Sequence, residues 1–501
     1  MNKLYRYIFI SLILISFNAC GGEKKDLADK VTTPTVEENQ TTPTILRKAW
    51  SHGNLQVSEE NRTLQHKDGT GFFWMADTAW DLYRLEREDI SKYMKDRAKK
   101  KFTVIQAVAM HAYWSKTGTA QNPLIDRNIS NPNEEYWEHI DYIIDEAEKE
   151  GMYVALLPVW HEALKQEDIN NTNDANTYGM WIANRYKDRP NIIWVIGGDT
   201  QADGTRLDNL TGEEEVAIWN ALGSSINNIA TNHLMTFHPL LRIPSEQLGN
   251  PDWLDFNMLQ SAREGIKHSI EHVQTALKKG LAVVDGESLY ENLAHRAEYN
   301  VTGIGEKARR TAFQMRNDAY SQLFVGAFGN TYGHNAVYRF YKGIKTSECD
   351  PTADENLSIW ICAPNMTWRE ALSAPGAVQM QYVTELMKSR PIVGRVEDQS
   401  LLQGTPHATQ GIVATRGDGY GMIYSSQGKD ITVVMGKISG SEVKAWWYNP
   451  RNGESTEIDE FENVGTHTFD PKGEPTKDPR VGNDWVLVID DKSKNFGEPG
   501  K

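Results

Sequence analysis

The stretch Ile192-Ile-Trp-Val-Ile-Gly-Gly-Asp199 decides the fold, together with a second stretch of the same form, Leu281-Ala-Val-Val-Asp-Gly-Glu287. Each begins as a continuous apolar run, which is typical of a parallel strand buried on both faces. Each ends on a carboxylate, and α/β barrels carry their chemistry at the carboxyl ends of their strands. Asp199 and Glu287 are therefore candidates for the acid/base and the nucleophile of a glycoside hydrolase. The alternative is that each caps a helix or pairs with an arginine.

Short apolar strands and helical stretches alternate from about residue 72 to 335. The first strand and its loop are predicted within 72–80, and further strands at 102–108, 152–158, 192–196, 234–238, 255–259, 281–284 and 324–329. Helices are predicted at 85–100, 133–149, 175–186, 213–231, 267–279 and 306–323. Eight alternations of this kind favour a (β/α)8 TIM barrel, here assigned to residues 46–394, over a doubly wound sheet.

The pattern changes after Pro391, and residues 395–501 are predicted to form a small all-β sandwich domain. Short strands are expected at 411–415, 420–424, 431–435, 443–448 and 485–489, between turn clusters. These strands carry Trp446, Trp447, Tyr448 and Trp485, which form either a sugar platform or a face that docks on the barrel. We favour docking, because the connection near 390–400 is short and is not rich in Gly and Ser.

The composition is that of a soluble globular protein, with 501 residues, 24% charged and 39% hydrophobic. This length suits a barrel followed by a smaller domain. The formal net charge of −15 argues against nucleic acid and anionic membrane surfaces as partners, since both need basic patches.

The N-terminus has the form of a secretion signal. Lys3 and Arg6 precede the apolar run 7–17, which has the length of a signal h-region and is short for a membrane span. The following Asn18-Ala-Cys20 resembles a bacterial lipoprotein signal, in which Cys20 is lipidated and becomes the mature N-terminus. Plain signal cleavage nearby is the alternative. Residues 21–45 lack large apolar side chains almost entirely and are predicted to tether the anchor to the enzyme. The expected location is outside the cytoplasm, lipid-anchored and facing the periplasm or the cell surface.

Cys349 and Cys362 lie in one loop-like stretch, 346–364. An exported protein can hold a disulfide there, and two free buried thiols are the alternative.

No cofactor is expected from the sequence. It contains no G-x-G-x-x-G after an early strand, no P-loop, no H-E-x-x-H and no paired C-x-x-C. It also lacks the G-x-S-x-G of a hydrolytic serine, which argues against an esterase.

In a barrel, the residues that follow each strand converge on one face. The candidates for substrate binding are Asp77, Trp80, His111, Trp114, Trp160, His161, His238, Gln260, Tyr290, Glu291, Tyr332 and His334. Aromatic rings, histidines and carboxylates together suit a sugar, because rings stack on its C–H faces and polar groups bind its hydroxyls. Taken singly, a histidine after a strand is more often structural. Acetal cleavage needs one carboxyl that stays protonated and one that stays ionised, so Asp199 and Glu287 should have different surroundings.

Several segments resemble the apiosidase-like catalytic domain of glycoside hydrolase family 140. They are 74–80 (WMADTAW), 191–199 (NIIWVIGGD), 285–291 (DGESLYE) and 326–335 (GAFGNTYGHN). The segments 446–453 (WWYNPRNG) and 484–488 (DWVLV) are similar to the β-domain that usually follows, often labelled collagen-binding, from which we infer no collagen binding. The resemblance spans about 45–491. It implies a retaining enzyme with Asp199 as acid/base and Glu287 as nucleophile.

Three departures from the family pattern concern specificity. Asn330 stands where relatives often have His, Ser288 where Pro is common, and Val337-Tyr338-Arg339-Phe340 replaces a frequent Ile-Trp-Gln. The leading hypothesis is an exported retaining glycoside hydrolase acting on a plant or algal polysaccharide, with pectic side chains as one candidate. A non-catalytic carbohydrate-binding lipoprotein on a barrel scaffold is the alternative, and a polysaccharide lyase is a third.

Overall fold

The computed structural model describes residues 50–203, 209–240, 242–261, 266–293, 309–343, 364–404, 411–476, 478 and 481–501. Cys20, the signal and tether segments, and the pair Cys349 and Cys362 lie outside these ranges, so their predictions stay predictions. Within the described ranges, no helix has both the length and the apolar character needed to cross a bilayer.

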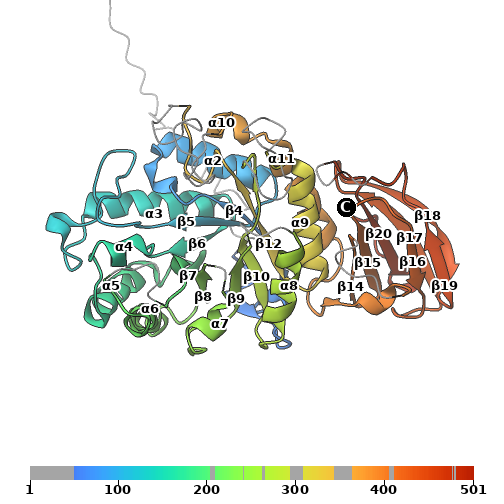
Figure 1. Cartoon of the computed structure of the whole chain (residues 1–501), viewed down its shortest axis with the longest axis horizontal. Helices are drawn as coiled ribbons and strands as arrows, with labels where there is room; N and C mark the ends of the chain where they lie inside the picture. The colour runs from blue at the N-terminus through green and yellow to red at the C-terminus, as the bar shows by residue number, and fades with distance from the viewer. Residues whose placement is uncertain are drawn as a thin grey trace, which may run out of the picture. The chain divides into compact units, whose positions relative to one another are not determined.

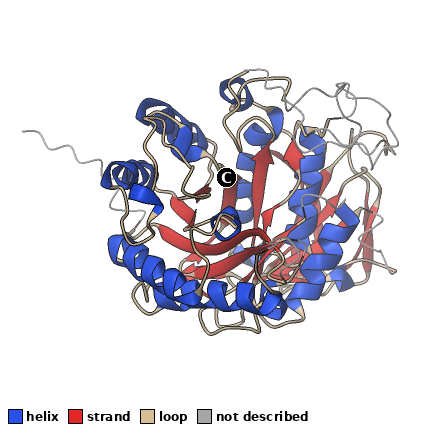
Figure 2. Cartoon of the chain, turned by 60° about the vertical axis from the view of Figure 1, so that its left-hand side comes forward, coloured by secondary structure: helices blue, strands red, loops and turns tan. Residues whose placement is uncertain are grey.

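Eight parallel strands form the predicted barrel, so the fold class is confirmed (Figures 1 and 2). They are β4 (Trp74–Thr78), β5 (Val104–Val108), β6 (Tyr153–Leu157), β7 (Ile192–Thr200), β8 (Met235–Pro239), β9 (Asn257–Gln260), β10 (Val283–Glu287) and β12 (Gly329–His334). The hydrogen-bonded order is β8-β7-β6-β5-β4-β12-β10-β9, and β11 (Tyr290–Glu291) adds to β12. Between β8 and β9 the closure is by separate bonds: Met235 N donates to Asp255 Oδ2 at 2.7 Å, and Thr236 Oγ1 donates to the Phe256 carbonyl at 2.7 Å.

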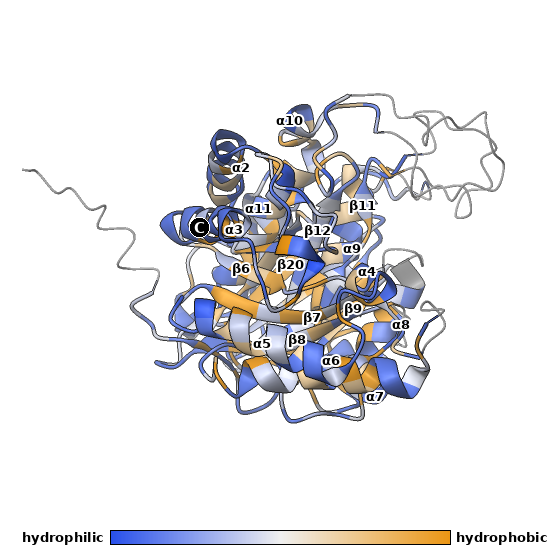
Figure 3. Ribbon diagram, turned by 90° about the vertical axis from the view of Figure 1, so that its left-hand side faces the viewer, coloured by the Kyte–Doolittle hydropathy of each residue, from blue (hydrophilic) through white to orange (hydrophobic). Residues whose placement is uncertain are grey.

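Helices surround the barrel, with their polar sides outward and the apolar strands inside them (Figure 3). They are α2 (Arg87–Lys99), α3 (Glu134–Lys149), α4 (Glu162–Lys165), α5 (Thr172–Tyr186), α6 (Gly212–Asn227), α7 (Pro244–Gln247), α8 (Ile266–Leu277), α9 (Ala312–Phe324), α10 (Trp368–Ala371) and α11 (Pro375–Lys388). Capping boxes begin α6 at Thr211 and α9 at Thr311, where a side-chain oxygen accepts from an otherwise unpaired N–H.

Alternate residues of each strand belong to two different cores, because successive side chains point to opposite faces. The inner core fills the barrel with residues such as Trp74, Val104 and Val195. The outer core lies between strands and helices and includes Met75, Ile105 and Trp194. A small sheet of β1 (Leu55–Val57), β2 (Leu64–His66) and β3 (Gly71–Phe72) adds Leu55, Leu64 and Phe72 to the inner core.

The eighth strand was predicted too early in the chain. Residues 324–329 contain the end of α9 and a turn, and β12 begins only at Gly329. The strand itself reads Gly-Asn-Thr-Tyr-Gly-His, which has little apolar character, whereas the preceding Phe324-Val-Gly-Ala-Phe328 has the composition expected of a strand.

The C-terminal domain is an antiparallel six-stranded sheet of β13 (Val396–Glu397), β14 (Ile412–Gly417), β15 (Tyr420–Ser425), β20 (Trp485–Asp491), β17 (Glu442–Asn449) and β18 (Glu454–Glu462), in that spatial order. A two-stranded sheet of β16 (Ile431–Val434) and β19 (Thr466–Phe469) contributes Ile431, Val433 and Phe469 to a shared core. Strands β18 and β19 were not predicted, because Glu454–Glu462 is mostly polar and exposed.

The four aromatic residues singled out in this domain are all buried, on two different faces. Trp446 and Tyr448 belong to the core cluster that includes the outer helices of the barrel, and Tyr448 Oη donates to the Tyr382 carbonyl of α11 at 2.7 Å. Trp447 and Trp485 belong to the interior of the β-domain instead. The docking interpretation is therefore confirmed for Trp446 and Tyr448 and is wrong for Trp447 and Trp485.

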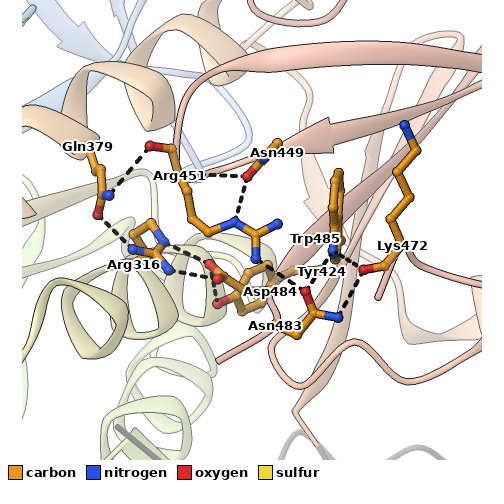
Figure 4. Close-up of polar contacts among 9 residues, drawn as sticks. All are labelled: Arg316, Gln379, Tyr424, Asn449, Arg451, Lys472, Asn483, Asp484 and Trp485. Atoms are coloured by element: carbon orange, nitrogen blue, oxygen red, sulfur yellow. Dashed lines mark hydrogen bonds and ion pairs between the residues drawn. The ribbon is translucent and has the colours of Figure 1, made fainter. Parts of the chain in front are cut away.

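Helix α9 carries much of the polar contact with the β-domain (Figures 1 and 4). Arg316 forms a bidentate ion pair with Asp484, with Nε–Oδ2 at 2.8 Å and Nη2–Oδ1 at 2.7 Å, and both side chains are buried. The Tyr320 ring of α9 stacks on Tyr424 of β15 at 5.0 Å. Arg395 donates to the carbonyl of Leu323 at the end of α9 at 2.5 Å. The barrel and the β-domain thus share a buried, hydrogen-bonded interface.

Candidate functional site

Asp199 lies in a bulge at the carboxyl end of β7. Gly197 pairs with His238 and Thr200 with Pro239, so β7 has two extra residues at this point. The φ angles of Gly197, Gly198 and Asp199 are 89°, 131° and 48°, which is the left-handed half of the map. A Cβ on Gly198 would also lie 2.5 Å from the Trp160 ring. The two glycines therefore let the strand turn sharply and present the Asp199 carboxylate at its end.

Glu287 is the last residue of β10 and lies, like Asp199, at the carboxyl ends of the barrel strands. A Cβ on Gly286 would collide with Met258, and the Gly286 carbonyl accepts from Gln106 Nε2 at 2.5 Å. The carbonyl of Glu287 accepts from the backbone N–H of Ser261 at 3.1 Å. The backbone of the second candidate is thus held from the adjacent strand β9 and from inside the barrel.

Gln260, at the end of β9, joins the two carboxylates. Its Nε2 donates to Oδ1 of Asp199 and to Oε2 of Glu287, the latter at 2.7 Å. His238 Nε2 lies 3.2 Å from the same Oε2, and His238 Nδ1 accepts from the Asp199 backbone N–H at 3.4 Å. That acceptor role assigns the imidazole proton to Nε2, which faces Glu287. The nearest side-chain ligand atoms of Asp199, His238 and Glu287 all lie within 4.8 Å of one another.

The pKa of Glu287 is lowered from its usual value. Burial acts to raise it, and this effect is outweighed by hydrogen bonds from His238, Tyr290 and Gln260. Tyr290 Oη donates to Oε1 at 2.9 Å and itself accepts from Trp80 Nε1 at 3.1 Å. Glu287 therefore stays ionised near neutral pH, as a nucleophile must.

A continuous set of aromatic rings borders the carboxylates. The ring centroids of Trp80, Trp160 and His238 lie 5.2–5.5 Å apart. His111 lies 5.4 Å from Trp160 and stacks on Trp114 at 6.1 Å, and Trp114 is 40% exposed. The rings thus extend from the partly buried carboxylates to solvent. Of the predicted site residues, the structure brings together around Asp199 and Glu287 a group of eight: Trp80, His111, Trp114, Trp160, His161, His238, Gln260 and Tyr290.

The other four predicted binding residues, Asp77, Glu291, Tyr332 and His334, lie elsewhere. Asp77 is fully buried on the helix side of β4, where it accepts from Arg97 Nε and Tyr93 Oη, each at 2.5 Å. Tyr332 is paired with Asp77 in the β4–β12 register and lies on the same side of the sheet. Such side chains support the fold and face away from the barrel mouth.

Glu291 and His334 are equally enclosed. Glu291 accepts from Tyr332 Oη at 2.5 Å and from the N–H of Gly376, at the start of α11, at 3.1 Å. His334 Nδ1 accepts from the Ala336 N–H at 3.0 Å. Burial, and then the positive charges of Arg97 and Arg309, lower the pKa of His334 to about 3, so it stays neutral.

Two residues near the site were not predicted from the sequence. Asp81 Oδ1 lies 3.0 Å from His111 Nε2, next to the imidazole ring on which Trp114 stacks. Gln106 faces the barrel interior and binds the Gly286 carbonyl. Each had a signal: Asp81 directly follows Trp80 in the same loop, and Gln106 is the polar residue within the apolar run of β5.

Asp199, His238 and Glu287 also form the kind of group that holds a metal ion. In this structure N–H donors from Gln260 and His238 face the carboxylate oxygens, and they supply the positive potential that a cation would supply. The Gln260 amide thus bridges the two carboxylates.

Solved structures of glycoside hydrolases are similar to this chain over most of its length. One structure titled "Glycoside hydrolase" is 33% identical, covers 90% of this chain and 99% of its own, and superposes with a TM-score of 0.78. A structure titled as a glycoside hydrolase family 5 protein from Bacteroides vulgatus ATCC 8482 is 31% identical, covers 90% of this chain and 95% of its own, and gives a TM-score of 0.77. Among curated proteins, no sequence matches this chain.

These relatives place the chain among the glycoside hydrolases. The family model described as "Apiosidase-like, catalytic domain" matches residues 58–394, and the chain belongs to that family. Residues 396–490 match the model "Putative collagen-binding domain of a collagenase".

Proposed function

We propose that this protein is a retaining glycoside hydrolase in which Asp199 is the acid/base and Glu287 the nucleophile. The observation that carries the proposal is the Gln260 amide, which donates to both carboxylates at once and holds them as a pair. Their nearest oxygens are within 4.8 Å. Carboxyl groups whose nearest oxygens lie within this limit suit the ~5–5.5 Å spacing of retaining enzymes better than the ~6.5–9.5 Å that inversion needs to admit a water molecule.

In the first step the Glu287 carboxylate attacks the anomeric carbon while Asp199 protonates the leaving oxygen, and a glycosyl-enzyme ester forms. In the second step Asp199 removes a proton from water, which displaces Glu287 from the ester. Tyr290 and His238 keep Glu287 ionised, and Trp80, Trp160 and the exposed Trp114 offer ring faces to the sugar C–H groups.

For the substrate we propose a plant or algal polysaccharide, with pectic side chains as the first to test. The family membership and the aromatic rings at the site support this proposal. We further propose that the enzyme is exported and lipid-anchored through Cys20, which the N-terminal charge, apolar run and cysteine support.

The test is hydrolysis of pectic and algal glycans, followed as new reducing ends without unsaturated products. Asp199→Asn and Glu287→Gln should each abolish turnover of the polymer, whereas the exposed matched controls Asp252→Asn and Glu213→Gln should not. On an aryl glycoside with a good leaving group, Asp199→Asn should still form the ester, because protonation is no longer needed, and Glu287→Gln should not. If either variant still turns over the polymer, the catalytic role proposed for the substituted residue is wrong. Unsaturated products would instead identify a lyase.

A further inference from the structure

A buried polar group, here called the carboxylate cluster, lies behind the nucleophile on the helix side of β10. It consists of Asp285, Asp318, Ser261, Ser269 and Gln322. Asp285 and Asp318 are each 1% exposed and Gln322 is fully buried. None of these five side chains belongs to the site described above, yet Asp285 is two residues from Glu287 and Ser261 directly follows Gln260.

Each hydrogen-bond partner of the Asp285 carboxylate among the described residues is a donor. Its Oδ1 accepts from the backbone N–H of Glu287 at 3.1 Å. Its Oδ2 accepts from Ser261 Oγ and from Gln322 Nε2, the latter at 2.8 Å. The orientation of the Gln322 amide is fixed, because its Oε1 accepts from Asn330 Nδ2 at 3.3 Å. Hydrogen bonds donated to both oxygens of a carboxylate stabilise its ionised form.

Asp318, on α9, has the opposite surroundings. Its Oδ1 accepts from Ser269 Oγ at 3.2 Å, and its Oδ2 has no hydrogen-bond partner among the residues that the structure describes. Burial, and then the negative charge of Asp285, raise the pKa of Asp318 to about 7, against the lowering effects of Ser269, the Leu289 N–H and Arg310. Burial also raises the pKa of Asp285, to about 6. Among the described residues, the cation that acts on this pair is Arg310, ahead of α9.

We propose that Asp285 is a positioning residue for the nucleophile and that Asp318 holds the one proton which the two buried aspartates share. The proposal rests on the proposed hydrolase function. Asp285 acts through two bonds: it orients the Glu287 backbone directly, and through Ser261 it fixes the end of β9, where Gln260 bridges the catalytic carboxylates. Gln322 Nε2 donates both to Asp285 Oδ2 and to Ser269 Oγ, whose hydroxyl in turn donates to Asp318 Oδ1, so one buried network links the two carboxylates. Two carboxylates linked in this way in a buried region cannot both be ionised without cost, so the proton on Asp318 lets Asp285 keep all three donors.

Two isosteric substitutions test this with opposite expectations. In Asp318→Asn the side chain is permanently neutral and its oxygen still accepts from Ser269, so kcat at neutral pH should stay within about 3-fold of wild type. In Asp285→Asn an NH2 group must face at least one N–H or O–H donor. The end of β10 shifts, and kcat should fall about 10- to 100-fold with little change in KM. Asp255→Asn is the matched control, because Asp255 is also a mostly buried aspartate whose pKa burial raises to about 6, at the β8–β9 closure. Its kcat should not change.

Thermal melting gives a readout that does not depend on activity. A pKa that is raised on folding favours the protonated folded state, so the stability that it contributes is present at low pH and is lost as pH rises through about 6–7. The Tm of wild type should therefore fall relative to that of Asp318→Asn between about pH 5 and 8. A difference between the two Tm values that is independent of pH would overturn the shared proton.

The activity assay uses a panel of aryl glycosides together with the pectic and algal glycans. If wild type turns over a substrate and Asp285→Asn is equally active, the positioning role is wrong and the hydrolase function stands. If wild type turns over none, the hydrolase function and the positioning role fail together, while the melting comparison still decides the shared proton. Should Asp285→Asn not fold, Ser261→Ala replaces it: this variant removes one donor without a charge, and a kcat equal to that of wild type would refute the role.

Discussion

Replacing Asp484 by alanine removes one partner of the buried ion pair that joins α9 to the β-domain (Figure 4). The Arg316 guanidinium would keep its bond to Gln379 Oε1 at 2.6 Å and would lose both bonds to Asp484. The Asp484 side chain is fully buried and that of Arg316 is 5% exposed, so water cannot readily replace the lost carboxylate.

Breaking a buried ion pair on one side costs ~3–5 kcal/mol, because a charge remains in the interior without its partner. We therefore expect the free energy of unfolding of Asp484→Ala to fall by that amount. The double variant Arg316→Met with Asp484→Leu removes both charges and should recover most of the loss, since replacing a buried pair by apolar residues is often neutral or stabilising.

The assay is chemical denaturation followed by tryptophan fluorescence and by far-UV circular dichroism. Lys492→Ala, which removes an exposed ion pair with Glu442, is the control and should leave the transition where it is in wild type. A loss below about 1 kcal/mol in Asp484→Ala, or no recovery in the double variant, would refute the view that a buried, desolvated pair holds the two domains together.

Four further predictions follow from the site and the chain's ends. Tyr290→Phe removes a hydrogen bond that lowers the pKa of Glu287, so the acid limb of the pH profile of kcat/KM should move to higher pH. An acid limb at the wild-type pH would show that Tyr290 does not lower this pKa. Trp114→Ala should raise KM about 3- to 10-fold with kcat unchanged, as measured on oligosaccharides, because it removes an exposed stacking surface. Deleting 395–501 should give an aggregated barrel, since Tyr320 and its neighbours on α9 become exposed; a soluble barrel that loses only polymer binding would identify a carbohydrate-binding domain instead. Cys20→Ala should release the protein from the membrane fraction, and unchanged fractionation would contradict the lipid anchor.

The strands that carry the catalytic candidates could be predicted because their apolar runs are continuous and end on a carboxylate. A continuous apolar run does not, however, show which side chains face the barrel interior and which face the helices. Asp77 follows Trp74-Met-Ala, in which all residues are buried, so the sequence gives no polar–apolar alternation from which to infer that Asp77 faces the helices. Asp77 and Tyr332 were therefore expected at the mouth, although the period of two in a strand places them outside the barrel.

Contacts between distant segments were beyond what the sequence offers. That Gln260 lies between Asp199 and Glu287 depends on the register of three strands, and the proximity of Asp318 to Asp285 depends on how α9 packs on β10. Strand β18 was not predicted and β12 was predicted too early in the chain, both because polar residues or glycines dominate these strands.

Helix α9 has consequences for how such a gene can change. Arg316 and Tyr320 on this helix contact the β-domain, while Asp318 and Gln322 contact the strands behind the nucleophile. A recombination event that removed or exchanged the second domain would leave a buried arginine and a tyrosine ring facing solvent on a helix that also borders the catalytic strands. We therefore expect the two domains to be inherited together. A protein that lost the second domain would need substitutions at Arg316 and Tyr320, while Asp318 and Gln322 on the same helix would have to be kept.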